Sequence, residues 1–184
     1  MKDRVKFFKT ALFNRKTGAL VRSSHYVVND VLKLIGNQPL EQIIEYGPGD
    51  GVMTRALLKH LETKGTLTVV EANSKFLHVL QSIKDPHLRI MEGTIQEVSS
   101  DLKKYGIEKP DLVVSSIPFS LLSPSERERV IQSTYDVLPA GGKFIVFHQY
   151  SWLMLKPLRK RFKKVTTRLE PRNLLPCFIF CAEK

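Results

Sequence analysis

The stretch from Ile43 to Leu61, IIEYGPGDGVMTRALLKHL, places three glycines at alternate positions between an apolar run and a helical pattern. Gly47, Gly49 and Gly51 permit backbone conformations and close approaches that residues with a Cβ atom do not. A loop that joins a strand to the start of a helix presents backbone N–H groups and the positive end of the helix dipole. The stretch therefore predicts a site for an anion or for the polar end of a cofactor, in a fold where strands lead into helices.

The rest of the chain alternates strand-length apolar runs with longer helical patterns. This order favours an α/β fold with a mostly parallel sheet and helices on both faces. We expect strands near Gln42–Tyr46, Leu67–Glu71, Leu88–Met91, Leu112–Ser115, Lys143–Tyr150 and Cys177–Ala182. We expect helices near Ser23–Ile35, Val52–Glu62, Lys75–Ile83 and Ser125–Val137.

Size and charge narrow the class of protein. The 184 residues include 29 Lys and Arg against 18 Asp and Glu, which gives a net charge of +11 and a pI near 9.7. This length fits one domain, and the charge predicts a polyanionic partner, either nucleic acid or an anionic lipid surface. The apolar runs are shorter than the roughly 20 residues that cross a bilayer, and no signal-peptide pattern opens the chain. We therefore expect an intracellular protein that is soluble or peripheral to a membrane.

Residues 1–22 form a segment apart from the domain that we expect at residues 23–184. Val5, Phe8 and Leu12 recur at helical spacing with lysines between them. The pattern predicts a basic amphipathic helix, which either lies on a membrane surface or packs its apolar stripe on the domain. Whether such a helix also acts as a lid over the cofactor is left open.

Glu71, at the end of the second expected strand, lies 20 residues after Gly51. A carboxylate at this place can accept hydrogen bonds from both hydroxyls of a ribose, as it does in several classes of nucleotide-binding enzyme. The dinucleotide pattern G-x-G-x-x-G requires a third glycine where this chain has Val52, which disfavours a nicotinamide cofactor.

Four motifs, IIEYGPGDG, VVEAN, IMEGTIQEV and PDLVVSSIPF, come in an order and at a spacing that resemble the class I S-adenosylmethionine-dependent methyltransferases. The resemblance covers the chain from about residue 20 onward. It implies a Rossmann-like, seven-stranded, mostly parallel sheet, with S-adenosylmethionine across the carboxyl ends of the first strands and no metal. The implied cofactor-binding residues are Glu45, Gly47, Gly49 and Gly51 at the methionine part, Glu71 and Ala72 at the ribose, Gly93, Thr94 and Ile95 at the adenine, and Ser115. Thr94 stands where many members of the family have an Asp for the adenine amine.

The loop after the fourth strand, SSIPFSLL, resembles the N-[I/L]-P-[F/Y] loop of the ribosomal RNA adenine dimethyltransferases. In that loop an amide side chain and the proline carbonyl accept hydrogen bonds from the substrate amine, while the aromatic ring stacks on the base. Ser116 occupies the amide position here, and a hydroxyl is a smaller, less directional acceptor. This departure weakens the expectation of an RNA substrate.

The chain resembles the bacterial phospholipid N-methyltransferases more closely. The shared features are the serine-containing loop, Thr17-Gly18-Ala19 followed by Ser23-Ser24, a fifth strand ending in tyrosine, and the late segment RNLLP from Arg172 to Pro176. The resemblance implies a methyl-acceptor site at Ser116, Pro118 and Phe119 of the loop, with Tyr150 at the end of the fifth strand. His148, near the end of the same strand, is a further candidate by its position.

Aromatic residues near this site suit a methylated amine. A quaternary ammonium favours aromatic faces, for which Phe119, Tyr150 and Trp152 are candidates, although the same rings could serve as core or rim packing. His148 or Tyr150 could accept the proton of the amine directly or through water, and His148 could equally be a structural histidine.

The segment Trp152–Lys164, WLMLKPLRKRFKK, interleaves apolar and basic residues. This pattern suits an anionic membrane, where each basic group near the surface contributes about 1 kcal/mol, and it is also compatible with a solvated basic helix. With residues 1–22, it would give two separate elements that dock on lipid.

The sequence thus predicts an S-adenosylmethionine-dependent N-methyltransferase that acts on the amine of phosphatidylethanolamine and its methylated derivatives, peripheral to the inner, cytoplasmic face of a membrane. The nearest alternative is a methyltransferase acting on adenine in ribosomal RNA or another nucleic acid. A third is a non-catalytic adaptor with the same fold, which the three glycines disfavour because they cost stability.

Overall fold

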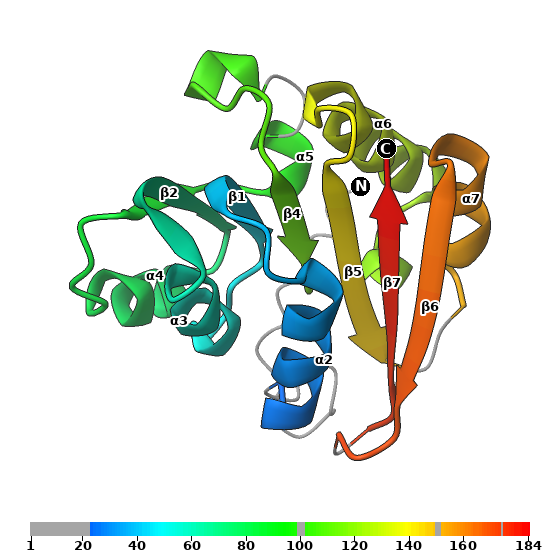
Figure 1. The fold of residues 1–184 in the computed structure, drawn as a ribbon, viewed down its shortest axis with the longest axis horizontal. Coiled ribbons are helices and arrows are strands. Elements are labelled where there is room, and N and C mark those ends of the chain that lie inside the picture. The colour runs from blue at the N-terminus through cyan, green and yellow to red at the C-terminus, as the bar shows by residue number, and fades with distance from the viewer. Residues whose placement is uncertain (1–22, 99–101, 150–151, 174) are drawn as a thin grey trace.

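The computed structural model of the chain describes residues 23–98, 102–149, 152–173 and 175–184. Within these residues, seven strands form one sheet in the order β3-β2-β1-β4-β5-β7-β6 (Figure 1). β7 runs antiparallel to both of its neighbours, and the other pairs are parallel. The strands are β1 (Leu40–Tyr46), β2 (Leu61–Glu71), β3 (Leu88–Glu92), β4 (Leu112–Ser115), β5 (Lys143–Gln149), β6 (Lys164–Glu170) and β7 (Cys177–Glu183).

Helices cover both faces of the sheet (Figure 1). The helices are α2 (His25–Ile35), α3 (Val52–Leu58), α4 (Ser74–Gln81), α5 (Ile95–Val98), α6 (Pro124–Val137) and α7 (Leu155–Arg161). Side chains of α2, α3 and α4 pack in one apolar cluster with one face, and those of α5, α6 and α7 pack in a second cluster with the other. The class I methyltransferase architecture that the sequence resemblance implied is therefore confirmed.

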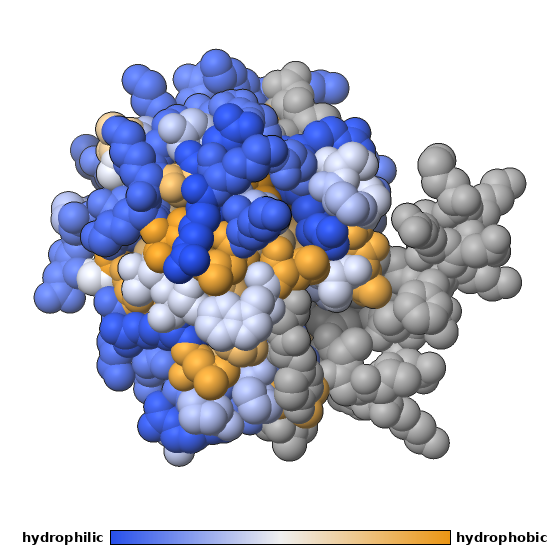
Figure 2. Space-filling view, turned by 90° about the vertical axis from the view of Figure 1, so that its right-hand side faces the viewer, coloured by the Kyte–Doolittle hydropathy of each residue, from blue (hydrophilic) through white to orange (hydrophobic). Residues whose placement is uncertain are grey.

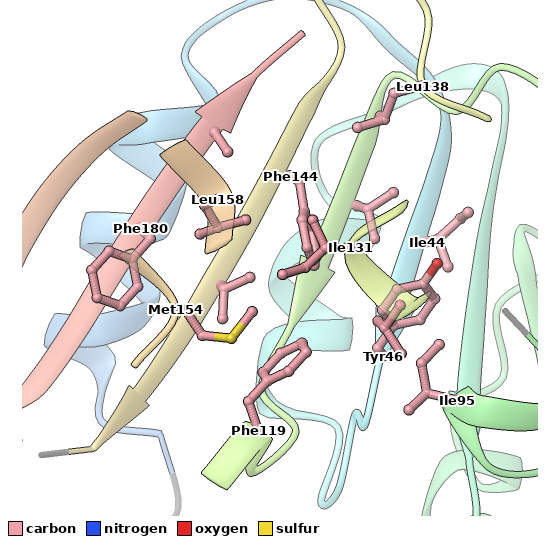
Figure 3. Close-up of a cluster of buried hydrophobic side chains, with 14 of the residues drawn as sticks. Ile44, Tyr46, Ile95, Phe119, Ile131, Leu138, Phe144, Met154, Leu158 and Phe180 are labelled. Atoms are coloured by element: carbon pink, nitrogen blue, oxygen red, sulfur yellow. The ribbon is translucent and has the colours of Figure 1, made fainter. Parts of the chain in front are cut away.

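The cluster beneath α5, α6 and α7 contains the largest fully buried rings of the described residues (Figure 3). Tyr46 at the end of β1 and Phe144 on β5 form a T-shaped pair with ring centroids 6.5 Å apart, and Phe180 of β7 is buried in the same cluster. The Tyr46 hydroxyl lies 3.3 Å from Thr134 Oγ1 on α6, so this polar atom has a partner inside the core. These contacts tie the carboxyl end of β1 to β5 and to α6.

Two features differ from the sequence expectation. The β6 strand was not predicted, because it is an edge strand with alternating polar residues and little burial. The helix predicted to reach Glu62 ends at Leu58, and β2 begins at Leu61. Gly65 lies within that strand extension, where a Cβ would be only 3.0 Å from the Leu40 carbonyl oxygen, so this glycine permits close backbone approach rather than a turn.

The parallel strands β1, β2, β4 and β5 end at the same edge of the sheet, which we call the active edge. The glycine loop, the SSIPFSLL loop and the β6–β7 connection all lie there. None of the helices in the described residues is long and apolar enough to span a membrane. The amphipathic helix predicted in residues 1–22 lies outside the described residues.

Candidate active site

The glycine loop connects β1 to α3 with three residues in the left-handed region. The φ angles of Gly47, Gly49 and Gly51 are 72°, 56° and 75°. The Gly47 N–H donates to the carbonyl of Val70, and the Gly51 N–H donates to that of Pro48. A side chain at any of the three positions would be strained, since L-residues rarely adopt these angles.

Glu71 anchors this loop from the end of β2. Its Oε2 accepts from the N–H of Gly49 at 3.0 Å, and its Oε1 accepts from the N–H of Asn73 at 2.9 Å. Burial raises the pKa of Glu71, while these backbone hydrogen bonds lower it. The Ala72 N–H also bonds to this carboxylate, which offers about four lone-pair sites and so can accept a further hydrogen bond, for example from a ribose hydroxyl.

Glu45 lies at the buried end of β1, with 1% of its surface exposed. Its Oε2 accepts a 2.6 Å hydrogen bond from Thr54 Oγ1 on α3. Burial raises the pKa of Glu45 to about 8; the hydroxyl of Thr54 opposes this shift, and the charges of Glu71 and Asp50 add to it. A buried carboxylate among other acids is a favourable environment for a cationic ligand.

The segment from Gly93 to Ile95 follows β3 at the same edge. The Gly93 N–H donates to the Glu71 carbonyl, and Ile95 packs in the core. Thr94 caps the following helix, because its Oγ1 accepts from the Glu97 N–H at 3.3 Å and its own N–H donates to Glu97 Oε2 at 2.9 Å. Its hydroxyl is thus already partly used by this capping box.

The loop after β4 is joined directly to the glycine loop. Ser116 Oγ donates a 2.6 Å hydrogen bond to the Gly47 carbonyl, and the Ser116 N–H donates to the Tyr46 carbonyl. A Cβ on Gly47 would lie 2.7 Å from Cγ2 of Ile117, so glycine is also required for the two loops to pack. The Pro118 carbonyl accepts from the Leu121 N–H in a short 3-10 turn.

Phe119 and Ser115 are completely buried in this structure. Phe119 belongs to the same buried apolar cluster as Ile131 and Met154 (Figure 3). A stacking role for its ring would therefore require the loop to rearrange. The Ser115 hydroxyl has no hydrogen-bond partner among the described residues.

His148 lies near the carboxyl end of β5, on the face that carries α7. Its ring centroid is 5.8 Å from that of Phe180, and its buried Nε2 has no partner in the described part of the chain. Burial lowers the pKa of His148 to about 4, so the imidazole is uncharged at neutral pH. Tyr150, which the sequence placed beside it, lies outside the described residues.

A cavity of about 390 Å³ adjoins the glycine loop between the first turns of α2 and α3. Its lining residues are Ser23, Ser24, His25, Val28, Asn29 and Val52. Asn173, which is buried, accepts through Oδ1 from the Ser24 N–H at 3.1 Å and so ties the β6–β7 connection to the start of α2. The motifs that contain Ser23-Ser24 and RNLLP, far apart in sequence, therefore meet at the active edge.

The residues present fit S-adenosylmethionine. A Cβ at Gly49 would meet no heavy atom of the described residues within 4 Å, so the loop has open space on that side. The carboxyl groups of Glu45 and Glu71 suit a ligand with a sulfonium, an ammonium and ribose hydroxyls. Of the cofactor-binding residues expected from the sequence, those of the glycine loop are brought together with Glu71 and Gly93 by hydrogen bonds.

Comparison with known proteins decides the family. The model of the ribosomal RNA adenine dimethylase family matches residues 11–124. The chain belongs to this family. It is an S-adenosylmethionine-dependent N-methyltransferase, as its motifs predicted.

Relatives of this adenine dimethylase-like chain include lipid-modifying and RNA-modifying enzymes. An ornithine lipid N-methyltransferase from Singulisphaera acidiphila is 26% identical over 175 residues, which cover 93% of this chain and 88% of the relative. A ribosomal RNA small subunit methyltransferase A from Chlorobium chlorochromatii is 27% identical over 111 residues, which cover 60% of this chain and 40% of the relative. Among solved structures, the N-methyltransferase NodS from Bradyrhizobium japonicum, in complex with S-adenosyl-L-homocysteine, superposes with a TM-score of 0.74 at 15% identity and covers 98% of both chains.

Sequence reasoning missed three residues that organise the site. Thr54 bonds to Glu45, Asn73 bonds to Glu71, and Asn173 bonds to Ser24. The first two had a local signal, since Thr54 lies on the helix that follows the glycine loop and Asn73 precedes a helix as its N-cap. Asn173 had none beyond its place in the RNLLP motif.

Proposed function

We propose that this protein transfers methyl groups from S-adenosylmethionine to the headgroup amine of a membrane lipid, with phosphatidylethanolamine and its methylated derivatives as the substrates. The observation that carries the proposal is the bond from Ser116 Oγ to the Gly47 carbonyl. The position that holds an amide in the RNA enzymes is a short hydroxyl turned toward the cofactor loop. A planar adenine amine would lose its directional acceptor there.

The relatives support the lipid class of substrate. Similarity to the ornithine lipid N-methyltransferase runs along 93% of this chain and 88% of that enzyme, whereas the matched part of the ribosomal RNA enzyme is 40% of its length. Ornithine lipids and phosphatidylethanolamine share a primary amine beside an anionic group at a membrane surface. The amine-bearing lipid headgroup is therefore the common substrate chemistry.

In the proposed site, the glycine loop, Glu45 and Glu71 hold the cofactor. When bound, S-adenosylmethionine supplies an electrophilic methyl group on its sulfonium sulfur. Loss of this methyl group leaves the sulfur as a neutral thioether. Because this methyl group is already reactive, the protein contributes mainly by holding the amine in line with it. Ser116 and the Pro118 carbonyl orient the amine, since each oxygen keeps a lone pair beyond the hydrogen bond that it makes within the protein.

The amine attacks only in its uncharged form. His148 is uncharged at neutral pH, so its ring can accept a hydrogen bond from the amine without adding positive charge beside the sulfonium. With a pKa of about 4 it does not retain the proton, which passes on to solvent. The role of Tyr150 as an alternative acceptor stays a prediction.

The proposed location is the cytoplasmic face of a membrane, with residues 1–22 as a membrane-binding helix and residues 23–184 as the catalytic domain. The net charge of +11 supports attraction to anionic lipid. The same charge, together with the match to the adenine dimethylase family, favours ribosomal RNA as the second candidate substrate.

Transfer of labelled methyl groups would test the proposal. The protein is given labelled S-adenosylmethionine with anionic vesicles that contain phosphatidylethanolamine, with vesicles that contain ornithine lipid, and with unmodified ribosomal RNA. Label in phosphatidylethanolamine is the expected result. Label in ornithine lipid alone would correct the headgroup, and label in RNA alone would refute the lipid substrate.

Two pairs of variants sharpen this experiment. Glu71→Gln should abolish transfer, while the matched control Glu92→Gln, at the exposed end of the neighbouring β3, should leave it unchanged. Ser116→Asn should reduce lipid methylation because the larger amide displaces the bond to Gly47, and Ser116→Ala should reduce it less. A gain of RNA methylation in Ser116→Asn without loss on lipid would contradict the assigned role of the hydroxyl.

A further inference from the structure

Exposed apolar side chains gather on one flank of the active edge. In the described residues, three large apolar side chains are well exposed: Val79 at 37%, Trp152 at 57% and Leu169 at 53%. Val79 lies on α4, whereas Trp152 and Leu169 lie on either side of Phe178. The ring centroids of Trp152 and Phe178 are 4.4 Å apart, and Leu169 is directly opposite Phe178 in the β6–β7 ladder.

The strand register connects this flank to the proposed acceptor site. Leu169 on β6, Phe178 on β7 and His148 on β5 are directly opposite one another across the three strands. Residues in such a row point to the same face of the sheet. Phe180 lies 6.3 Å from the Trp152 ring and 5.8 Å from the His148 ring. A continuous apolar row therefore runs from the exposed edge of the sheet to His148.

The exposed patch is not the one that the sequence pattern indicated. In the segment Trp152–Lys164, the side chains of Met154, Leu158 and Phe162 are buried in the core. The apolar stripe of α7 therefore holds the helix on the sheet. The exposed apolar surface is formed by Trp152 together with Leu169, from the strand that the sequence did not predict.

Basic residues are frequent in the segment that contains α7 and β6. Between Leu155 and Glu170 the chain has seven basic residues and one acid, Glu170, which is buried. Three of the cations pair with acids: Lys160 with Glu128, Lys164 with Glu183, and Arg168 with Asp30. Figure 2 shows this side of the molecule, where hydrophobic residues form a band between hydrophilic ones.

We propose that Trp152, Phe178 and Leu169, with the basic residues of α7, form a docking surface for an anionic lipid bilayer. The inference rests on the proposed function, because docking by this flank would bring a lipid headgroup to the row that ends at His148. The cations complement anionic lipid, and the apolar side chains gain free energy by entering the boundary between headgroups and acyl chains. Tryptophan suits that boundary because its ring has an apolar body and a polar N–H. A surface that only tracked phosphates would gain nothing from the exposed leucine.

The fluorescence of Trp152, the single tryptophan of the chain, reports directly on this docking. The full-length protein is titrated with vesicles of phosphatidylglycerol and phosphatidylcholine, and with phosphatidylcholine alone. We expect a blue shift with the anionic vesicles and quenching of the emission when their acyl chains are brominated. If the protein sediments with the vesicles and its emission is unchanged, the proposal is overturned, because another part of the chain would then bind the bilayer. A response to ribosomal RNA and none to vesicles would overturn it as well.

A matched pair of variants tests the surface itself. Leu169→Glu should weaken partitioning into anionic vesicles about tenfold. It removes an apolar side chain that would enter the bilayer and adds a negative charge, which the anionic lipids repel. Val79→Glu, at the other exposed apolar position, should leave partitioning unchanged. The milder variant Leu169→Gln, and circular dichroism of all three, separate loss of docking from loss of folding. Equal losses in Leu169→Glu and Val79→Glu, with both folded, would overturn the assignment.

Activity measurements separate this inference from the proposed function. With docking as proposed, Leu169→Glu loses about tenfold in methyl transfer to phosphatidylethanolamine in vesicles and keeps its activity on a short-chain lipid amine dispersed in solution. If no lipid is methylated but Trp152 still enters the bilayer, the proposed substrate fails and the docking surface stands. If vesicle lipid is methylated equally by wild type and Leu169→Glu, the substrate stands and the docking surface fails.

Discussion

Replacing Glu45 by glutamine should stabilise the protein without cofactor and weaken its binding of S-adenosylmethionine. Glu45 is buried at the end of β1 and accepts a hydrogen bond from Thr54 Oγ1. A glutamine has the same shape, and its amide oxygen can accept the same hydrogen bond. The substitution therefore removes the buried charge and keeps the packing.

The magnitude follows from the pKa of Glu45, which burial raises from 4.5 to about 8. The folded protein holds a proton on this carboxyl in a pH range where the unfolded chain has released it. Ionisation of the buried Glu45 therefore lowers the free energy of unfolding. This loss is absent below the pKa of the unfolded chain, grows as the pH rises, and is complete above the pKa of the folded protein. At about 1.4 kcal/mol for each pKa unit, the cost is about 3 kcal/mol at pH 7 and on the order of 5 kcal/mol above pH 8.

Urea unfolding of the cofactor-free protein at pH 5 and pH 8.5 would measure this cost. Compared with wild type, Glu45→Gln should lose less free energy of unfolding between the two pH values, by several kcal/mol. Glu92→Gln, which changes an exposed carboxyl, should behave like wild type. An unfolding free energy of Glu45→Gln that falls as steeply with pH as that of wild type would refute the reasoning.

Calorimetry of cofactor binding provides the second readout. The positive charges of S-adenosylmethionine favour the carboxylate form, so wild type should release close to one proton from Glu45 on binding at pH 7. Its affinity should then rise with pH up to about 8. Glu45→Gln should release no such proton and bind more weakly at pH 8 than wild type.

Three further predictions concern the surrounding loops. Gly47→Ala should reduce stability and cofactor affinity more than Gly49→Ala does. Both residues have positive φ, but only a Cβ at Gly47 would lie 2.7 Å from a side-chain atom of Ile117. Equal losses of the two variants in thermal unfolding would contradict this. Asn173→Ala should destabilise the protein by about 1–3 kcal/mol, because it leaves the Ser24 N–H without its acceptor, and denaturant unfolding against wild type measures the change. The ring signals of His148, assigned by comparison with His148→Gln, should titrate near pH 4 in nuclear magnetic resonance spectra, and a midpoint above 6 would show that the ring is not desolvated.

The cofactor half of the proposed site could be predicted from local sequence patterns. A strand, three glycines and a helix in immediate succession constrain the backbone locally, so Gly47, Gly49 and Gly51 were assigned to a cofactor loop before any tertiary contact was known. Glu71 followed from its place at the end of the next strand. The strand–helix alternation likewise predicted the parallel sheet, because the periodicity of burial differs between strands and helices.

The contacts of the proposed acceptor half could not be predicted from local patterns. The bond from Ser116 to Gly47 joins residues 69 positions apart, and the bond from Asn173 to Ser24 joins residues 149 apart. Local periodicity has no information about such pairs. The structure also placed Phe119 in the core, where the sequence had offered both a stacking role and packing.

The same reason explains the exposed flank. From the sequence, the apolar residues of Trp152–Lys164 suggested a membrane-facing helix, yet most of that stripe is covered by the sheet. Trp152 and Leu169 lie on different elements and share a surface only because β7 inserts antiparallel between β5 and β6. Local pattern fixed which residues are apolar, and the order of the strands decided which of them face outward.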